Sequence, residues 1–462
     1  MGMATYLHPG VYVEEVPSSV HPIAGVGTST AGFIGIVPDT FDLPELTNVL
    51  IGTGDGTKTT FTLPNTPVDT TAGSFSFTVA GTADAGATVA NAATPPASTV
   101  TLSTAPASGA AIRGSYTPQF APVGAAQPVQ CNSFADFITS FGPFNADAGH
   151  TSLAQGVYGF FSNGGTTCYV SRETAIANIA GGSLAQFETI DDIAIVAAPG
   201  VVDGGVWAAI TTHCAVTTQD RFAILDIQRD LGAGASPDLT MLQLTSADTV
   251  LPLATDYGAV YFPWIQVANP IGTGTLTVAP SGHIAGIYAR VDAERGVHKA
   301  PANEPVMNAT GLRYGLSDAQ QDNLNPQGVN AIRSINDSIL VWGARTLGGD
   351  ENSEWKYISV RRLLIYIRKS IYRGTGWVVF EPNDASLWAK IIRNVTDFLT
   401  GVWQDGALLG AKASDAFYVK CDAETNPANV IAAGQVVTEI GLAVVQPAEF
   451  VIFRISQGAS LS

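Results

Sequence analysis

A strand, a helix and a second strand follow one another in the middle of this 462-residue chain, and this succession limits the possible folds more than any other pattern. Apolar runs at 192–198 and 222–227 have the length of buried strands, and the segment between them, 205–215, has a helical pattern. Two strands joined through a helix run parallel in one sheet. Further segments continue the pattern: strands at 31–37, 167–171 and 257–267, and helices at 135–141, 153–161 and 281–295. The sequence therefore predicts a mixed α/β fold with several domains.

Residues 48–118 interrupt this pattern. They are dense in Thr, Gly, Ala and Pro and contain one lysine and one arginine, Lys58 and Arg113. Short strand-like runs at 58–63, 74–79 and 99–102 are separated by turn residues. We interpret 48–118 as a small β-rich module inserted into an α/β middle domain, which is made of residues 23–47 and 119–340.

The last part of the chain contains two long predicted helices. In 354–372, apolar residues recur at the spacing of one helix face. Asp384 is a suitable N-cap for a second helix at 385–403. We expect a C-terminal domain at 341–446 that begins somewhere within 290–345. Extended arms are expected on both sides of the globular part, at 1–22 and at 447–462.

The charge balance excludes some classes of function. The chain has 22 basic and 39 acidic residues, a formal net charge of −17, whereas a protein that coats nucleic acid needs a basic surface. Only 13% of the residues are charged, compared with about 25% in typical soluble domains. Much of the surface must therefore be uncharged or buried against other chains.

The expected environment is the cytoplasm, with no membrane insertion. The first basic residue is Lys58, so a secretory signal is not expected. No run of about 20 mostly apolar residues is present for a membrane span. The four cysteines lie far apart in sequence, without a CxxC pair, and we interpret them as reduced core thiols.

No group of residues has the spacing of a catalytic, cofactor or metal site. The glycine-rich stretch 52–58 lacks the phosphate-loop spacing, and neither HExxH nor GxSxG occurs. Adjacent helix positions point in different directions, so His213 and Cys214 do not make one metal site. Asp191 and Asp192 could form a carboxylate pair, or one of them could simply start a strand. We expect no enzyme activity, but the strand–helix–strand unit leaves a nucleotide-binding α/β enzyme as an alternative, and the 48–118 module leaves a passive surface module.

The helix predicted at 354–372 carries a cluster of basic residues. Arg362, Lys369 and Arg373 fall at i, i+7 and i+11, on the side away from the apolar positions. They could be a solvated face, partners in salt bridges within the chain, or a surface complementary to an acidic protein.

The two ends of the chain each contain an isolated strand-like segment. At the start it is Val11, Tyr12, Val13 and Glu14; at the end it is Phe450, Val451, Ile452, Phe453, Arg454 and Ile455. Neither has an adjacent hairpin partner, and a lone strand must pair with a sheet edge. The edge could belong to the same chain or to a neighbouring subunit, as in β-augmentation.

Eight stretches along the chain resemble a known family. They are YLHPGVYVEE at 6–15, SGHIAG at 281–286, RGVHKAPAN at 295–303, LNPQGVN at 324–330, VWGART at 341–346, VRRL at 360–363, FEPND at 380–384 and PAEF at 447–450. Together they are similar to the contractile tail sheath proteins of phages, R-type pyocins and contractile injection systems. The resemblance covers about residues 1–47 and 119–462, and the 48–118 module has no counterpart in the smallest sheaths.

The resemblance implies a homo-oligomer, a six-start helix of stacked hexameric rings around an inner tube that contracts to drive the tube through a target envelope. It also implies that both arms exchange between subunits, that the C-terminal domain lies near the tube, that variable modules lie outside, and that baseplate and terminator proteins are further partners. Contacts to the tube would be largely electrostatic, which makes Arg362, Lys369 and Arg373, with Lys390 and Arg393 as a rival set, candidates for them. The particle would assemble in the cytoplasm of the producing cell or form part of a virion tail.

Overall fold

The computed structural model describes residues 22–93, 96–242, 250–352 and 354–450. The chain forms two compact units: a central unit of residues 27–366 and 446–462, and a C-terminal unit of residues 1–26 and 367–445. The boundary between the two units lies within helix α7 (Ile358–Gly374). The first turns of α7 belong to the central unit because Ile358 and Ile365 pack in its hydrophobic core.

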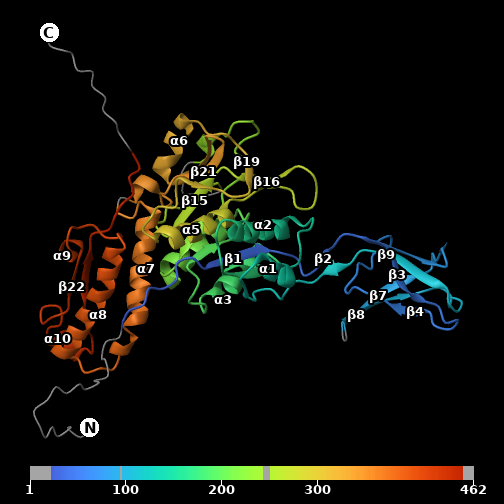
Figure 1. The fold of residues 1–462 in the computed structure, drawn as a ribbon, viewed down its shortest axis with the longest axis horizontal. Helices are drawn as coiled ribbons and strands as arrows, with labels where there is room; N and C mark the ends of the chain where they lie inside the picture. Colours follow the sequence, from blue (N-terminus) through green and yellow to red (C-terminus); the bar gives the residue numbers. More distant parts are fainter. Residues whose placement is uncertain (1–21, 94–95, 243–249, 353, 451–462) are drawn as a thin grey trace, which may run out of the picture. The chain divides into compact units, whose positions relative to one another are not determined.

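A nine-stranded sheet forms the middle of the central unit (Figure 1). Its inner strands run parallel, as the sequence predicts, and both edges are antiparallel. In spatial order the strands are β11 (Val129–Cys131), β12 (Cys168–Glu173), β1 (Ala31–Ile36), β13 (Ile195–Ala197), β14 (Phe222–Leu225), β15 (Gly258–Phe262), β20 (Val329–Ile335), β21 (Ser338–Trp342) and β18 (Glu304–Pro305).

Both faces of this sheet are covered, as a parallel sheet requires. Successive side chains of a strand point to opposite faces, so Phe33 enters one core and Ile34 the other. The core around Phe33 is closed by α1 (Phe134–Phe141), α2 (Ala148–Ser162) and α5 (Ser281–Arg295). The core around Ile34 is closed by α3 (Ala185–Phe187), α4 (Gly204–Thr212) and α6 (Asp318–Leu324).

Helices α2 and α5 approach so closely that glycine is required between them. A Cβ atom on Gly282 would lie 2.2 Å from the carbonyl oxygen of Gly156. A Cβ on Gly286 would lie 2.4 Å from the carbonyl oxygen of Phe160. The stretch 281–286 therefore has a packing reason for both of its glycines.

The predicted strand at 257–267 is two strands in two different sheets. β15 ends at Phe262, and Pro263, which cannot donate to a strand ladder, follows it. β16 (Ile265–Ala268) lies in the middle of a small antiparallel sheet with β17 (Thr275–Val278) and β19 (Ala309–Leu312).

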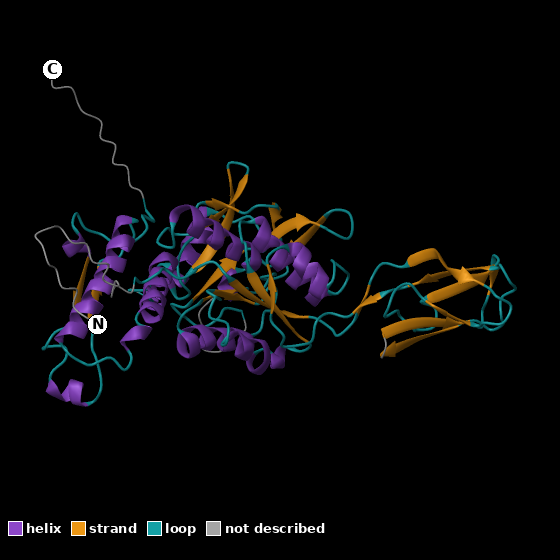
Figure 2. Cartoon of the chain, turned by 60° about the horizontal axis from the view of Figure 1, so that its bottom comes forward, coloured by secondary structure: helices purple, strands orange, loops and turns teal. Residues whose placement is uncertain are grey.

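The inserted module consists of strands and loops in the described residues (Figure 2). The chain enters it through β2 (Phe41–Asp42) and leaves through β10 (Gln119–Phe120), and these two strands pair with each other. Phe61, Phe77 and Tyr116 are among the side chains of its own small core. One sheet contains β3 (Leu46–Thr53), β9 (Ala111–Tyr116), β5 (Phe75–Val79) and β6 (Thr82–Ala83); the other contains β4 (Thr60–Thr62), β8 (Pro96–Thr101) and β7 (Thr88–Ala93).

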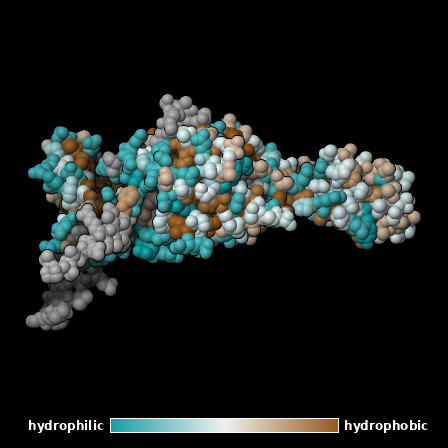
Figure 3. Space-filling view, turned by 90° about the horizontal axis from the view of Figure 1, so that it is seen from above, coloured by the Kyte–Doolittle hydropathy of each residue, from teal (hydrophilic) through white to brown (hydrophobic). Residues whose placement is uncertain are grey.

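On the face drawn in Figure 3, the module is mostly of intermediate hydropathy, shown as pale atoms, which agrees with its richness in Thr, Gly and Ala.

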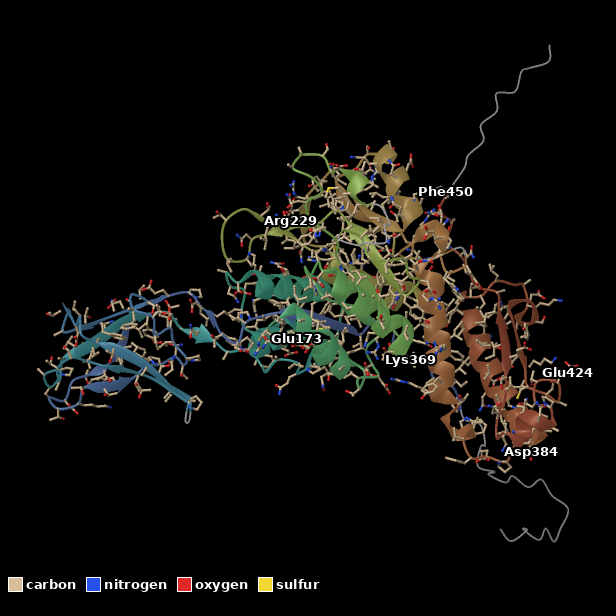
Figure 4. The ribbon with its side chains drawn as sticks, turned by 180° about the vertical axis from the view of Figure 1, so that it is seen from behind. Glu173, Arg229, Lys369, Asp384, Glu424 and Phe450 are labelled. Carbon is tan, nitrogen blue, oxygen red and sulfur yellow. The ribbon has the colours of Figure 1, made fainter. Side chains whose placement is uncertain are left out.

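The C-terminal unit contains the second half of α7 and the long helix α8 (Ala385–Gln404). Asp384 is the N-cap of α8, as predicted, and its side chain accepts hydrogen bonds from the amides of Ser386 and Leu387 (Figure 4). The unit also contains α9 (Ala413–Ala416), β22 (Phe417–Lys420), α10 (Ala428–Ala432) and β23 (Glu439–Leu442). In the described part of the chain, no helix combines the length and apolarity needed to cross a bilayer.

Candidate functional site

The predicted arm strands lie almost entirely outside the described residues. Val11–Glu14 and Val451–Ile455 are not described, and of the whole set only Phe450 is. Its side chain is 72% exposed, and Figure 4 labels it where the described chain ends. The pairing of both arms therefore stays a prediction.

The C-terminal unit contains a sheet that could receive such arms. β22 and β23 are antiparallel, and within the described ranges they form a sheet of two strands. Residues 443–445 continue beyond β23 and bond to residues 407–409: the Leu409 amide donates to the Ala443 carbonyl, and the Val445 amide to the Ala407 carbonyl. Since the described residues place no third strand in this sheet, an added strand could bond at the edges of β22 and β23.

The base of the C-terminal arm is held in the central unit. The Glu449 carboxylate receives four hydrogen bonds: from Arg345 Nε (2.8 Å) and Nη2 (2.8 Å), from Asn325 Nδ2 (2.7 Å) and from Tyr357 Oη (3.1 Å). The Arg345 contact is bidentate, the strongest arrangement for this pair. Partial burial alone would raise the pKa of Glu449, but the bonds from Arg345 and Asn325 outweigh it and hold that pKa below its usual value.

Further hydrogen bonds hold the backbone and the guanidinium of Arg345 in place. Asn330 accepts from the Arg345 amide (2.8 Å) through Oδ1 and donates to the Arg345 carbonyl (2.8 Å) through Nδ2. Arg345 Nη1 donates to the Asn325 carbonyl (2.9 Å) and to Asp350 (3.1 Å). Three of the family-like stretches, 324–330, 341–346 and 447–450, thus meet at this point. Sequence reasoning noted each stretch but did not predict that they contact one another.

Arg362 is buried, which agrees with the alternative of a salt bridge within the chain and not with a surface contact. Its guanidinium is buried and donates to both oxygens of Asp292, at 2.9 Å from Nη1 and 2.6 Å from Nη2. It also donates to the Thr28 carbonyl (2.9 Å) and lies over the ring of Tyr288. This is an internal salt bridge, so we remove Arg362 from the candidates for tube contact.

The other basic candidates are spread between interior and surface. Lys369 is buried, and Figure 4 labels it on α7. Arg373 and Arg393 are exposed, and Lys390 is half-buried. On α7, two side chains of the first set, Arg362 and Lys369, are thus buried, and Arg373 is exposed. We therefore remove Lys369 from the candidates for tube contact as well.

At the carboxyl end of β14, a buried carboxylate holds parts of the fold together. Asp226 follows β14 and is fully enclosed; it accepts from the Ser281 amide (3.1 Å) and hydroxyl (2.6 Å) and from the Gly200 amide (3.0 Å). Burial raises the pKa of Asp226 to about 6. This carboxylate holds the start of α5 in place. Among the described residues, no three metal-binding side chains gather.

Two family descriptions match the chain. Residues 179–347 match the phage tail sheath protein central domain, and residues 350–458 match the phage tail sheath C-terminal domain. Together these ranges take in more than half of the 462 residues.

Two curated relatives are tail sheath proteins. A putative prophage major tail sheath protein of Pseudomonas aeruginosa is 28% identical over 42% of this chain and 49% of its own length. The tail sheath protein of Burkholderia phage BcepMu is 28% identical over 47% of this chain and 44% of its own length. The chain therefore spans about half the length of the curated relatives it matches.

Solved structures share the fold over almost the entire chain. The sheath of an extracellular contractile injection system, PVC, in its contracted state is 25% identical, with a TM-score of 0.64, covering 99% of both chains. A chain of the anti-feeding prophage (AFP) baseplate is 24% identical, with a TM-score of 0.63, covering 98% of this chain and 100% of the other. The chain belongs to the phage tail sheath protein family.

Proposed function

We propose that this chain is the structural subunit of a contractile sheath. Many copies would form a helical array of hexameric rings around an inner tube, and contraction of the array would drive the tube through a target envelope. The observation that carries the proposal is the likeness to the PVC sheath in its contracted state over 99% of both chains. The low charged fraction supports it, because much of the surface would be covered by other subunits.

The two-stranded sheet of β22 and β23 is the proposed receiver of neighbouring arms. Val11–Glu14 of one subunit and Phe450–Ile455 of another would add strands at its edges. Main-chain hydrogen bonds would supply the affinity, and alternate side chains would fix the register. The paired arms would act as tethers that survive the rearrangement of the lattice.

Arg373, Lys390 and Arg393 are the remaining candidates for the surface that faces the tube. They belong to the C-terminal unit, and none of the three is buried. Inner tube, baseplate and terminator proteins are the proposed partners, and the 48–118 module is proposed to lie on the outside.

The sheath proposal is tested by negative-stain electron microscopy of the purified chain, with size-exclusion chromatography beside it. Hollow ridged cylinders of uniform width are expected. A species that remains monomeric on concentration would contradict the proposal and would return attention to ligand screening of the α/β unit.

The tether proposal is tested by deleting residues 1–16 or residues 448–462. Each deletion should abolish cylinders and leave a folded monomer. Sheaths that still assemble and contract without either segment would show that the arms are not required.

A further inference from the structure

The C-terminal arm does not begin at the unit that precedes it in the sequence. The chain completes the C-terminal unit at Val445 and returns to the central unit from residue 446 onward. Glu449 then lies against Arg345, Asn325 and Tyr357, all of which belong to the central unit. The segment that follows Phe450 therefore starts from a point fixed on the central unit.

Arg345 depends on this contact. Its side chain is 4% exposed, and a buried charge is costly unless it is paired and hydrogen-bonded. Asp350, its other carboxylate neighbour, is 54% exposed and also bonds Lys356. Glu449, at 19% exposure and with bidentate geometry, is the better-shielded partner.

The fixed backbone of Arg345 gives the contact its rigidity. Asn330 bonds both the amide and the carbonyl of Arg345, and it also donates to the Val260 carbonyl on β15 (3.1 Å). Tyr357 lies opposite Arg345 in a short antiparallel bridge, so two of the donors to Glu449 come from paired backbone. The guanidinium is thereby linked to the central sheet.

We propose that Arg345, Asn325 and Tyr357 form an anchor for Glu449, and that this anchor sets the point and direction from which the C-terminal arm leaves the subunit. The anchor is a feature of the single chain. Its consequence for assembly rests on the proposed function: a neighbour that holds the arm strand would pull on the central sheet through Glu449 and Arg345, instead of unravelling the arm from its base.

The anchor can be tested on the monomer with spin labels. The four native cysteines are buried, so labels can be directed to Phe450→Cys in the arm and to the exposed Ser334→Cys on β20. The distance distribution between the labels should be narrow in the otherwise unchanged chain. Glu449→Gln keeps the shape of the side chain but removes its charge, and it should broaden the distribution at least twofold.

Glu351→Gln is the matched control, because it removes an exposed charge six residues from Arg345 and leaves the anchor intact. It should leave the width unchanged. Glu449→Gln should lower the thermal midpoint, because it leaves buried Arg345 with Asp350 as its carboxylate partner. The distances are therefore measured well below the midpoint of both proteins, with circular dichroism showing that each is folded, which separates release of the arm from loss of the fold. Equal widths in all three proteins would overturn the anchor.

Assembly is then scored by electron microscopy on the chain without labels. Glu449→Gln should give at least tenfold fewer cylinders than Glu351→Gln at the same concentration. Unchanged yield together with a broadened distance distribution would overturn the role of the anchor in assembly. Absence of cylinders from the unmodified chain would refute the sheath proposal, while the distance measurement would still decide the anchor.

Discussion

Arg361 and Arg362 are adjacent on α7, and both form ion pairs with other residues of the same chain. Arg361 lies over the rings of Tyr257 and Trp355 and forms an ion pair with Asp256. Arg362 is bonded to Asp292. The sequence showed their charge and their helical spacing, but their carboxylate partners, Asp256 and Asp292, come from segments 70 or more residues away. A helix pattern cannot reveal a salt bridge to such a distant segment.

The Arg362–Asp292 pair should be important for stability. Arg362→Ala would leave a buried carboxylate without its partner, and we expect a loss of about 3–5 kcal/mol in the free energy of unfolding. Arg393→Ala, at an exposed position of α8, should change it by less than about 0.5 kcal/mol. Urea denaturation of the monomer measures both. Similar losses for the two variants would contradict the assignment.

Asp226 should make stability depend on pH. Its pKa is about 6 in the folded chain against 3.8 when exposed, because burial disfavours the charged form. Between these values the folded state binds more protons, so this group's contribution to stability is present below about pH 4 and is lost as the pH rises through 6. A shift of about two pKa units corresponds to about 3 kcal/mol at most.

Asp226→Asn should remove the loss of stability that Asp226 causes as the pH rises. The variant's stability relative to the parent should rise between pH 4 and pH 6 and then stay level, as measured by denaturation at a series of pH values. The comparison between variants is needed because burial lowers the pKa of His283 to about 4, which makes its contribution increase with pH in the same window. A constant difference across the range would contradict the role of Asp226.

At the scale of elements, local signals were sufficient for the long helices, but the short helix α6 was not predicted, and neither were the contacts between distant segments. Helix α8 and its cap Asp384 follow from residues next to one another in the sequence, and both were predicted. The parallel sheet was predicted from strand–helix–strand succession, although the split between β15 and β16 was not. The anchor joins Glu449 to residues 92 to 124 positions earlier in the chain, and no local pattern encodes that approach.

The packing of α2 on α5 should be intolerant of a single methyl group. In a helix interior, Gly→Ala usually adds about 1 kcal/mol of stability. Gly286→Ala should instead destabilise by about 2 kcal/mol or more, because its Cβ would overlap the backbone of Phe160. Gly401→Ala in α8 is the control, since nothing lies within 4 Å of its Cβ. Thermal denaturation of both variants should give shifts of opposite sign.

At the scale of the whole molecule, the inserted module should be separable from the rest. Its own core and the pairing of β2 with β10, where Asp42 lies opposite Gln119, mean that the chain enters and leaves at neighbouring points. Insertions of this kind can be removed without breaking the parent core. Replacing residues 45–116 by a short Gly/Ser linker should therefore leave the helices and the nine-stranded sheet folded.

If the module decorates the outside of the sheath, the shortened chain should still form cylinders, and these should be narrower than those of the full chain. Circular dichroism first establishes that the shortened chain is folded, and electron microscopy then measures cylinder width in both proteins. A folded chain that fails to assemble would place the module at contacts between subunits. Because the module contains few charges, its removal takes few charged residues from the surface, and the shortened chain should also remain soluble. A failure to assemble could then be distinguished from aggregation.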